Sequence, residues 1–352
     1  MADIDLIPGD LRALLLEHYW AHRRDLPWRH TTDPYHIWVS EIMLQQTQVK
    51  TVLPRYQEFL EQFPDIATLA SVSEETVCEA WAGLGYYRRA RNLRKGAQYV
   101  VEHFGGVMPR TAKELQTLPG VGRYTAGAIA SIAFGEEAPL VDGNVVRFFA
   151  RLFGLPGDKE STALKKRLWV LAEELVIGEY PGDLNQALME QGATVCTPSS
   201  PDCRTCAVSH HCVGYHEGEP EKYPAPSPKK ARKKLHVAFG WHSTRTGLWL
   251  EQRGMDGLWP GLWELPSAEA KDQAEAVKLL GRRVALGDAV PLAEIRHQLT
   301  HRDVTATVYA LKKRPGSREQ GEAKRYAMPL QAPLSALARK AIMAVQEQDS
   351  GG

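Results

Sequence analysis

The sequence has 352 residues, of which 43% are hydrophobic and 24% are charged, and its formal net charge is +1. This length indicates two domains, and this composition excludes a wholly disordered chain. The net charge conceals an uneven distribution, because residues 1–221 carry 21 basic and 29 acidic side chains, whereas residues 222–352 carry 22 basic and 13 acidic ones. A near-neutral total therefore does not exclude a nucleic-acid partner.

The first residues and the apolar stretches argue against secretion and membrane insertion. Residues 1–5 are acidic, whereas the start of a secretory signal peptide is basic. The longest apolar stretch, 124–135, is far too short to span a membrane. We therefore expect a cytoplasmic protein (nucleoid-associated in a bacterium) without membrane contact. In such a reducing compartment, clustered cysteines hold metal more often than they form disulfides.

Apolar residues recur at helical spacing from residue 1 to about residue 212, which predicts an all-α domain. Short segments containing Gly, Pro or Asp separate the predicted helices. These helices are expected at 11–20, 37–44, 49–59, 74–82, 90–104, 124–134, 145–153, 164–175 and 184–192.

Glu41 lies in the second predicted helix, on the same face as Ile37 and Trp38. A carboxyl group on an apolar face loses solvation, so its pKa should rise, which suits a general acid. Periodicity supports equally a Glu at the edge of that face whose carboxylate reaches water.

Residues 86–95 combine two tyrosines with five cations and no acid. Such a stripe can stack on bases and hold phosphates, or it can be a solvated helix face. The string 118–126 joins two predicted helices, and Gly120, Val121 and Gly122 form its turn. Tight turning there would expose amide N–H groups to a DNA phosphate, although an ordinary helix–helix turn is the alternative.

Asp142 directly precedes the predicted helix 145–153. Asp is common at this position as an N-cap, and the cap also fixes the carboxylate rigidly. Together, Glu41 and Asp142 would supply one protonated and one ionised carboxyl group, which glycosidic bond cleavage requires. The acid protonates the leaving group, and the carboxylate stabilises the cationic sugar.

Four of the five cysteines fall within 17 residues, and four thiolates this close can surround one metal centre. Their spacing does not identify the metal, since zinc sites usually show two close pairs and the ferredoxin repeat of C-x2-C is absent. His210 and His211 could also serve as zinc ligands. Cys78, in an apolar helical segment, is expected to be buried and unreactive. The spacing is Cys196-x6-Cys203-x2-Cys206-x5-Cys212.

Residues 213–234 are predicted to be a linker, because the Pro-rich segment 223–228 should be extended. The basic run 229–234 that follows is either a solvated hinge or a phosphate contact. The pattern then changes, and residues 235–345 are predicted to form an α+β domain. Its strands are expected at 235–241, 248–252 and 304–311, and its helix at 268–280.

Several strings together resemble the MutY family of adenine DNA glycosylases, within the helix-hairpin-helix superfamily. They are Pro27-Trp28-Arg29, residues 40–48, 83–88, 118–126 and 141–145, and the cysteine spacing. The resemblance implies a multidomain chain with a helical glycosylase domain at 1–212. The loop 196–212 would hold a [4Fe–4S] cluster through Cys196, Cys203, Cys206 and Cys212. The expected partner is double-stranded DNA containing 8-oxoG:A or G:A mispairs, bound by a monomer.

The resemblance also implies roles for single residues. Adenine would be flipped from the duplex, Glu41 would protonate its N7, and Asp142 would stabilise an oxocarbenium-like sugar. Tyr124 and Asn144 match positions that flank this chemistry, and Trp28, Arg29, Gln186 and Met189 match positions in the adenine pocket. Gln46, Thr47, Leu84 and the expected wedge Tyr86 match positions that face the lesion. Gly120, Val121 and Gly122 match positions that bind the DNA backbone.

The endonuclease III branch shares the hairpin and the cluster, but places a Schiff-base lysine after the hairpin Gly-Arg. Tyr124 occupies that position here, so the amine nucleophile for strand cleavage is missing and a monofunctional enzyme is expected. A glycosylase-lyase and a non-catalytic, metal-containing DNA-binding protein remain as alternatives.

The second domain resembles Nudix hydrolases through residues 257–266. The segment 268–283 lacks the paired glutamates of the Nudix metal site, so a lesion-recognition domain without hydrolase activity is expected. The family's lesion loop usually reads Phe-Ser-His, and this sequence reads Leu299-Thr300-His301. Thr300 and His301 are therefore expected to contact the lesion without the aromatic residue.

Overall fold

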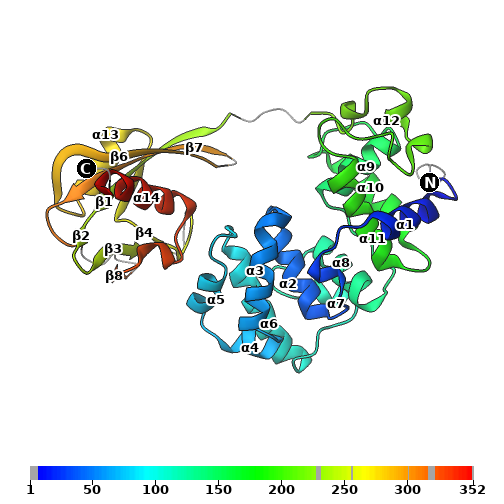
Figure 1. The fold of residues 1–352 in the computed structure, drawn as a ribbon, viewed down its shortest axis with the longest axis horizontal. Coiled ribbons are helices and arrows are strands. Elements are labelled where there is room, and N and C mark those ends of the chain that lie inside the picture. The colour runs from blue at the N-terminus through cyan, green and yellow to red at the C-terminus, as the bar shows by residue number, and fades with distance from the viewer. Residues whose placement is uncertain (1–6, 227–230, 255–256, 300, 316–321, 351–352) are drawn as a thin grey trace. The chain divides into compact units, whose positions relative to one another are not determined.

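The computed structural model describes residues 7–226, 231–254, 257–299, 301–315 and 322–350 (Figure 1). The chain divides into two compact units. The first contains the described residues up to 72 and those from 88 to 226. The second contains residues 73–87 and the described residues from 231 onward. No described helix is long and apolar enough to cross a membrane.

The first unit is built from α-helices. The nine helices expected from the sequence are all confirmed, eight in this unit and the one at 74–82 as α5 of the second unit. Short 3-10 turns at Pro27–Arg29, Ser209–His211 and Pro220–Lys222 and a π-turn at Gln191–Val195 join them. The helices of this unit are α1 (Leu11–His22), α2 (Pro34–Leu44), α3 (Val49–Gln62), α4 (Ile66–Ser71), α6 (Arg88–Phe104), α7 (Ala112–Leu115), α8 (Arg123–Phe134), α9 (Gly143–Leu152), α10 (Thr162–Val176), α11 (Pro181–Glu190) and α12 (Val213–His216).

One apolar core holds α1, α8, α9, α10 and α11 together. Leu15, Phe149, Leu168 and Leu184 lie near its centre and are almost fully buried. Phe149 projects from α9, so the same contacts that build the core also fix the N-terminus of α9. This matters for the site, because Asp142 is the N-cap residue of that helix.

Part of the segment expected to be a linker is packed against the first unit. Helix α12 contacts α9, and the Arg151 Nε donates a hydrogen bond to the carbonyl oxygen of Tyr223 over 3.0 Å. The segment 229–230 of the basic run lies outside the described residues. Lys233 and Lys234 already belong to the first strand of the second unit.

The second unit is α+β, as expected. One sheet has the order β5-β1-β7-β6, with β1 parallel to β7 and the other pairs antiparallel. In the other sheet β3 lies between β2 and β4 and also pairs with β8. Helix α13 packs on β1 and β5, and α14 packs on β6 and β7. The bounds are α5 Glu74–Ala80, β1 Lys233–Trp241, β2 Ser243–Thr244, β3 Gly247–Gln252, β4 Trp263–Glu264, β5 Ser267–Ala270, α13 Gln273–Gly281, β6 Leu286–Leu299, β7 Arg302–Leu311, β8 Ala323–Tyr326, and α14 Ala336–Ser350.

The prediction of a helix over residues 268–280 is wrong for its first residues, because the observed helix α13 starts later. Residues Ser267–Ala270 form β5, which pairs with β1, so sheet pairing overrides the helix propensity of its alanines. The helix starts after Asp272, whose carboxylate accepts a hydrogen bond from the amide of Glu275 over 2.9 Å. The strands β6 and β8 and the helix α14 were not expected from the sequence.

Close packing around α8 gives a first testable prediction. A Cβ at Gly127 would lie 2.0 Å from the carbonyl oxygen of Pro139, in the segment that leads to Asp142. We therefore expect Gly127→Ala to lower the free energy of unfolding by about 1–3 kcal/mol, because overpacking forces the backbone to shift. Gly143→Ala is the control, since no heavy atom lies within 4 Å of its Cβ. Urea unfolding should show this control at wild-type stability or above, and equal effects of the two substitutions would contradict the close approach.

Candidate active site

A cavity of about 640 Å³, here called the Glu41 cavity, lies in the first unit, lined by residues of α2, α8, α9 and α11 and of the segments beside them. It brings together ten residues that the sequence comparison singled out, although they come from four separate parts of the chain. Sites of this size and mixed polarity are typical of small-molecule pockets. The ten residues are Trp28, Arg29, Glu41, Gln46, Thr47, Tyr124, Asp142, Asn144, Gln186 and Met189.

Glu41 is buried, so α2 presents this carboxyl group to the cavity and not to bulk solvent. Burial, together with the smaller effect of the negative charge on Asp142, raises the pKa of Glu41 to about 7. The Tyr124 hydroxyl opposes this rise by donating a hydrogen bond to Glu41 Oε2 over 2.7 Å. Glu41 therefore holds its proton near neutral pH, as a general acid must.

Asp142 caps α9 and faces the same cavity. Its Oδ1 accepts the backbone amides of Asn144 and Val145 over 2.9 and 2.7 Å, and its Oδ2 accepts the Asn144 side-chain amide over 2.9 Å. Burial raises the pKa of Asp142, while these three hydrogen bonds and the nearby Arg147 lower it. The two functions considered for this residue, helix cap and cavity carboxylate, are both present.

A chain of hydrogen bonds connects Asp142 to the cysteine loop. Asn144, which donates to Asp142, accepts from Arg147 Nη2 over 2.9 Å. Arg147 Nε donates to the carbonyl oxygen of Cys196 over 2.7 Å, and its Nη2 also donates to that of Gly192. The position of the Asp142 carboxylate therefore depends on the backbone of this loop.

Glu190 and Arg24 also line the cavity, and neither was expected there from the sequence. Glu190 Oε2 is 2.6 Å from an Arg24 nitrogen and 2.7 Å from an Arg29 nitrogen. Burial opposes ionisation of Glu190, but hydrogen bonds from Arg24 and Arg29 outweigh it and lower its pKa to about 2. The arginine expected in the adenine pocket is therefore held in place by this carboxylate.

The cations of 86–95 do not form the open stripe that their spacing allows. Arg89 donates to the carbonyl oxygens of Ile42 and Met43, both over 2.9 Å, and so satisfies the C-terminal end of α2. Arg91 is buried, and Arg94 Nε donates to the carbonyl oxygen of Val72. Three of the five cations are thus used inside the protein, whereas Arg88 and Lys95 are exposed.

The glycine hairpin precedes α8 and lies apart from the residues that line the Glu41 cavity. Gly120 adopts a φ of 81°, and the Val121 amide donates to the carbonyl oxygen of Leu118 over 3.1 Å. Gly122 is the N-cap of α8 and has no side chain to cap it, so the first amides of α8 are offered to solvent or to an anion. The anion site suggested by the sequence is thus confined to these amides.

The remaining lesion-facing residues lie in the second unit. Tyr86 is 56% exposed with a φ of 46°, whereas Leu84 is buried. His301 is exposed, and Thr300 lies outside the described residues. Cys78 is buried, as expected.

The clustered cysteines all line one apolar cavity, together with Phe148 and Val208. Arg151 Nη1 and Gln191 Nε2 donate to the sulfurs of Cys196 and Cys206 over 3.4 and 3.0 Å. Burial raises the pKa of the Cys206 thiol to about 11. In the described part of the chain, no three of these sulfurs lie within 4.8 Å of one another.

The second unit buries its carboxylates against arginines. Glu264 accepts from Arg253 over 2.8 Å, and Glu251 accepts from Arg283 over 2.7 Å. Both glutamates are fully buried. These acids neutralise guanidinium groups and are not arranged as an open set of metal ligands.

Two family models match the chain. Residues 39–174 match the HhH-GPD superfamily of base excision DNA repair proteins, and residues 237–344 match the NUDIX domain. The first match contains Glu41, Tyr124 and Asp142. The two matches correspond to the helical and the α+β unit.

Individual proteins are similar over most of the chain. A human adenine DNA glycosylase is 39% identical over 85% of this chain and 66% of its own length, so the chain spans just under two thirds of that relative. An adenine DNA glycosylase of Buchnera aphidicola (subsp. Acyrthosiphon pisum) is 33% identical over 80% of this chain and 81% of its own. The solved structure of a thermostable thymine-DNA glycosylase is 34% identical, with a TM-score of 0.53 over 58% of this chain and 95% of its own.

The Glu190 ion pairs give a prediction about stability. The pKa of Glu190 is about 2 in the folded protein against an ordinary 4.5, so its ionised form stabilises the fold. That contribution is complete above the ordinary pKa and is lost as the pH falls towards about 2. Glu190→Gln should lower the free energy of unfolding by about 2–3 kcal/mol at pH 7, and the deficit should shrink in acid.

Urea unfolding at several pH values measures this difference. Glu58→Gln is the matched control, because Glu58 pairs with Arg55 at the exposed surface of α3. Its effect should stay below about 0.5 kcal/mol. A Glu190→Gln deficit that does not change with pH would contradict the assigned role of the charge.

Proposed function

Because the chain belongs to the adenine DNA glycosylases, we propose that it excises adenine from double-stranded DNA in base excision repair. Its substrate would be adenine mispaired with 8-oxoguanine or guanine, and it would act as a monomer on genomic DNA in the cytoplasm. The proposal is carried by one observation: the carboxyl groups of the buried Glu41 and the partly buried Asp142 face a single cavity. Hydrolysis of a glycosidic bond requires a protonated acid and an ionised carboxylate that reach the same bond.

Base flipping would bring the adenine into the Glu41 cavity. A nucleotide inside a duplex cannot be reached, and extrusion costs a few kcal/mol that contacts in the pocket offset. Trp28, Gln186 and Met189 line the cavity and supply apolar surface and an amide to hold the base. Arg29, fixed by Glu190, adds a positioned cation.

Glu41 would transfer its proton to N7 of the adenine. Protonation turns the base into a neutral leaving group, so the N-glycosidic bond can break with oxocarbenium character on the sugar. The pKa of about 7 leaves a large protonated fraction at neutral pH. The Tyr124 hydroxyl would then stabilise the carboxylate that this transfer leaves behind, since it already donates to Glu41.

Asp142 would stabilise the cationic sugar. Its carboxylate is held by Asn144 and by the amides of α9, so no reorganisation is needed when positive charge develops. A water molecule completes the hydrolysis. Asn144 is a positioning residue in this scheme, because it acts through the carboxylate.

The four cysteines would hold a [4Fe–4S] cluster. Four thiolates around one zinc ion lie about 3.8 Å apart, given a Zn–S bond of about 2.3 Å. The wider spread of the sulfurs, with no three within 4.8 Å among the described residues, fits a larger centre. The bonds from Arg151 and Gln191 to sulfur suit a centre that carries negative charge on its thiolates. Such a cluster would order the loop that supports Arg147.

Contacts with DNA outside the cavity would come from several surfaces. The amides at the start of α8 suit a phosphate, and Arg88 and Lys95 of α6 are exposed. The exposed Tyr86 suits a wedge between bases. The segment 222–352, which has 22 basic and 13 acidic residues and supplies most of the second unit, would add phosphate contacts. Through Thr300 and His301 it would also add lesion contacts without nucleotide hydrolysis.

The proposed acid predicts both a mutant phenotype and a pH profile. Single-turnover adenine release from an 8-oxoG:A duplex should slow as the pH rises through about 7, because Glu41 must be protonated to act. Glu41→Gln should reduce the rate about 10²–10⁴-fold. Glu58→Gln, an exposed matched control, should keep the wild-type rate and profile. Adenine release by Glu41→Gln at the wild-type rate would exclude Glu41 as the acid. No adenine release by the wild-type protein would instead favour a non-catalytic DNA-binding protein.

Because position 124 is not a lysine, we predict that the protein forms no imine with the DNA during the reaction. Sodium borohydride added during turnover should not cross-link the protein to DNA, because Tyr124 offers no amine to form an imine. Tyr124→Lys is a positive control that places an amine next to Glu41. Efficient trapping of the wild-type protein would favour the glycosylase-lyase alternative.

A further inference from the structure

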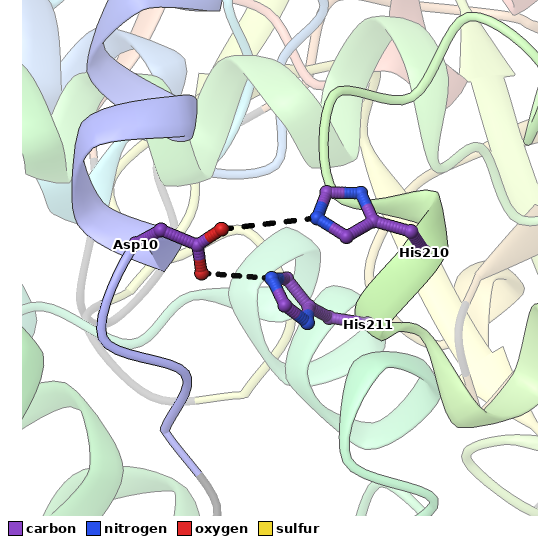
Figure 2. A group of neighbouring side chains, drawn as sticks. All are labelled: Asp10, His210 and His211. Atoms are coloured by element: carbon purple, nitrogen blue, oxygen red, sulfur yellow. Dashed lines mark hydrogen bonds and ion pairs between the residues drawn. The ribbon is translucent and has the colours of Figure 1, made fainter.

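Asp10, His210 and His211 form a side-chain cluster (Figure 2). None of the three lines the Glu41 cavity. Asp10 precedes α1, and the two histidines lie in the 3-10 turn that leads to Cys212. One carboxylate oxygen of Asp10 lies 2.8 Å from His211 Nε2, and the other lies 3.9 Å from His210 Nε2. Both imidazoles thus turn towards one carboxylate from a part of the chain 200 residues away.

We propose that Asp10, His210 and His211 bind a divalent transition-metal ion, with zinc as the fitting species. Zinc takes imidazole nitrogens at about 2.0–2.1 Å and carboxylate oxygens at about 2.0–2.2 Å, so neighbouring ligand atoms in a tetrahedral site lie about 3.4 Å apart. The two distances to Asp10 lie on either side of this value, and all three ligand atoms fall within 4.8 Å of one another. Small side-chain rotations therefore complete the site.

The backbone already holds the three ligands in position. Asp10 occupies the N-cap position of α1, yet its carboxylate makes no capping hydrogen bond and turns to the histidines instead. The amide of His211 donates to the carbonyl oxygen of Val208. His216 Nε2 lies 2.9 Å from the carbonyl oxygen of His210. The rings of His210 and His211 lie with centroids 4.0 Å apart, and the Nε2 atom of each faces the Asp10 carboxylate. A site preorganised in this way loses little entropy on binding.

The ligand set selects the kind of metal. Two imidazoles and one carboxylate favour zinc, nickel or copper over magnesium and calcium, which prefer oxygen ligands. Asp10 and His210 are 56% and 55% exposed, so an ion can enter and water can fill the remaining position. The ligands also differ from the cysteine centre, because neither histidine lines the cavity that the four cysteines share.

A metal ion bound at this site would connect the start of α1 to the loop that carries the four clustered cysteines. Without metal, the two segments are joined there by the hydrogen bond between Asp10 and His211. A bound ion would add coordination to both histidines at once, and anything that binds only the folded state stabilises it. The proposed consequence is a metal-dependent gain in thermal stability of the first unit.

Isothermal titration with ZnCl2 tests the site on the full, untagged chain, purified with its cysteine centre intact and pretreated with a mild chelator. One zinc ion per chain should bind, and the midpoint of thermal unfolding should rise. Asp10→Asn and His211→Ala should each weaken binding at least about 10-fold and remove the rise in stability. His103→Ala is the matched control, because His103 is an exposed histidine beside a single carboxylate, that of Glu102, and should bind as wild type.

Cobalt identifies which ligands are used. Co²⁺ at the proposed site should show weak visible bands without the intense near-ultraviolet absorption of cobalt thiolates. Zinc binding that survives both substitutions, cobalt–thiolate absorption in the intact protein, or no binding at all would each overturn the proposal. Circular dichroism of the variants ensures that loss of binding does not reflect loss of the fold.

Discussion

Two carboxyl groups removed from water in the same cavity are the constraint on which the first unit depends. A pKa of about 7 for Glu41, against an ordinary 4.5, corresponds to about 3 kcal/mol acting against its ionisation. Burial also raises the pKa of Asp142, but three hydrogen bonds and Arg147 oppose this rise. The two acids therefore differ in the number of hydrogen bonds that they accept. Glu41 accepts one from Tyr124, and Asp142 accepts three from residues of α9. Different environments for two like groups are how one site supports both an acid and a carboxylate.

Arginines hold the elements that carry these acids. Arg89 binds the last carbonyl oxygens of α2, close to Glu41 in the chain. Arg147 ties α9 to the cysteine loop, and Arg151 binds the same loop through the carbonyl oxygens of Thr197 and Pro198. A guanidinium group has five donors in a fixed plane and keeps its charge, so one side chain can join several carbonyl oxygens. The two cavity acids thus lie on helices whose ends are held by arginines that are partly or fully buried.

The sequence reveals most of the helices and the residues of the cavity, but not the partners that position them. Helical periodicity depends on a residue's own neighbours, and so α2, α8 and α9 could be predicted. The pairing of Arg29 with Glu190 joins positions 161 apart, and no local pattern signals it. The error at 268–280 has the same origin, because β5 owes its conformation to pairing with β1. The strand β6 contains a proline and irregular register, which conceal its alternation.

Charge counted along the sequence therefore does not locate charge on the surface. The five cations of 86–95 suggested an open basic stripe, yet Arg89, Arg91 and Arg94 are used within the fold. A DNA-binding surface on the first unit must then rely on fewer side-chain cations and more on backbone amides, such as those at the start of α8. Amides bind phosphate without adding net charge, which reconciles a polyanionic substrate with the 29 acids and 21 bases of residues 1–221. Because amide contacts add no net charge, DNA binding by the first unit should depend less on salt concentration than DNA binding by the basic second unit.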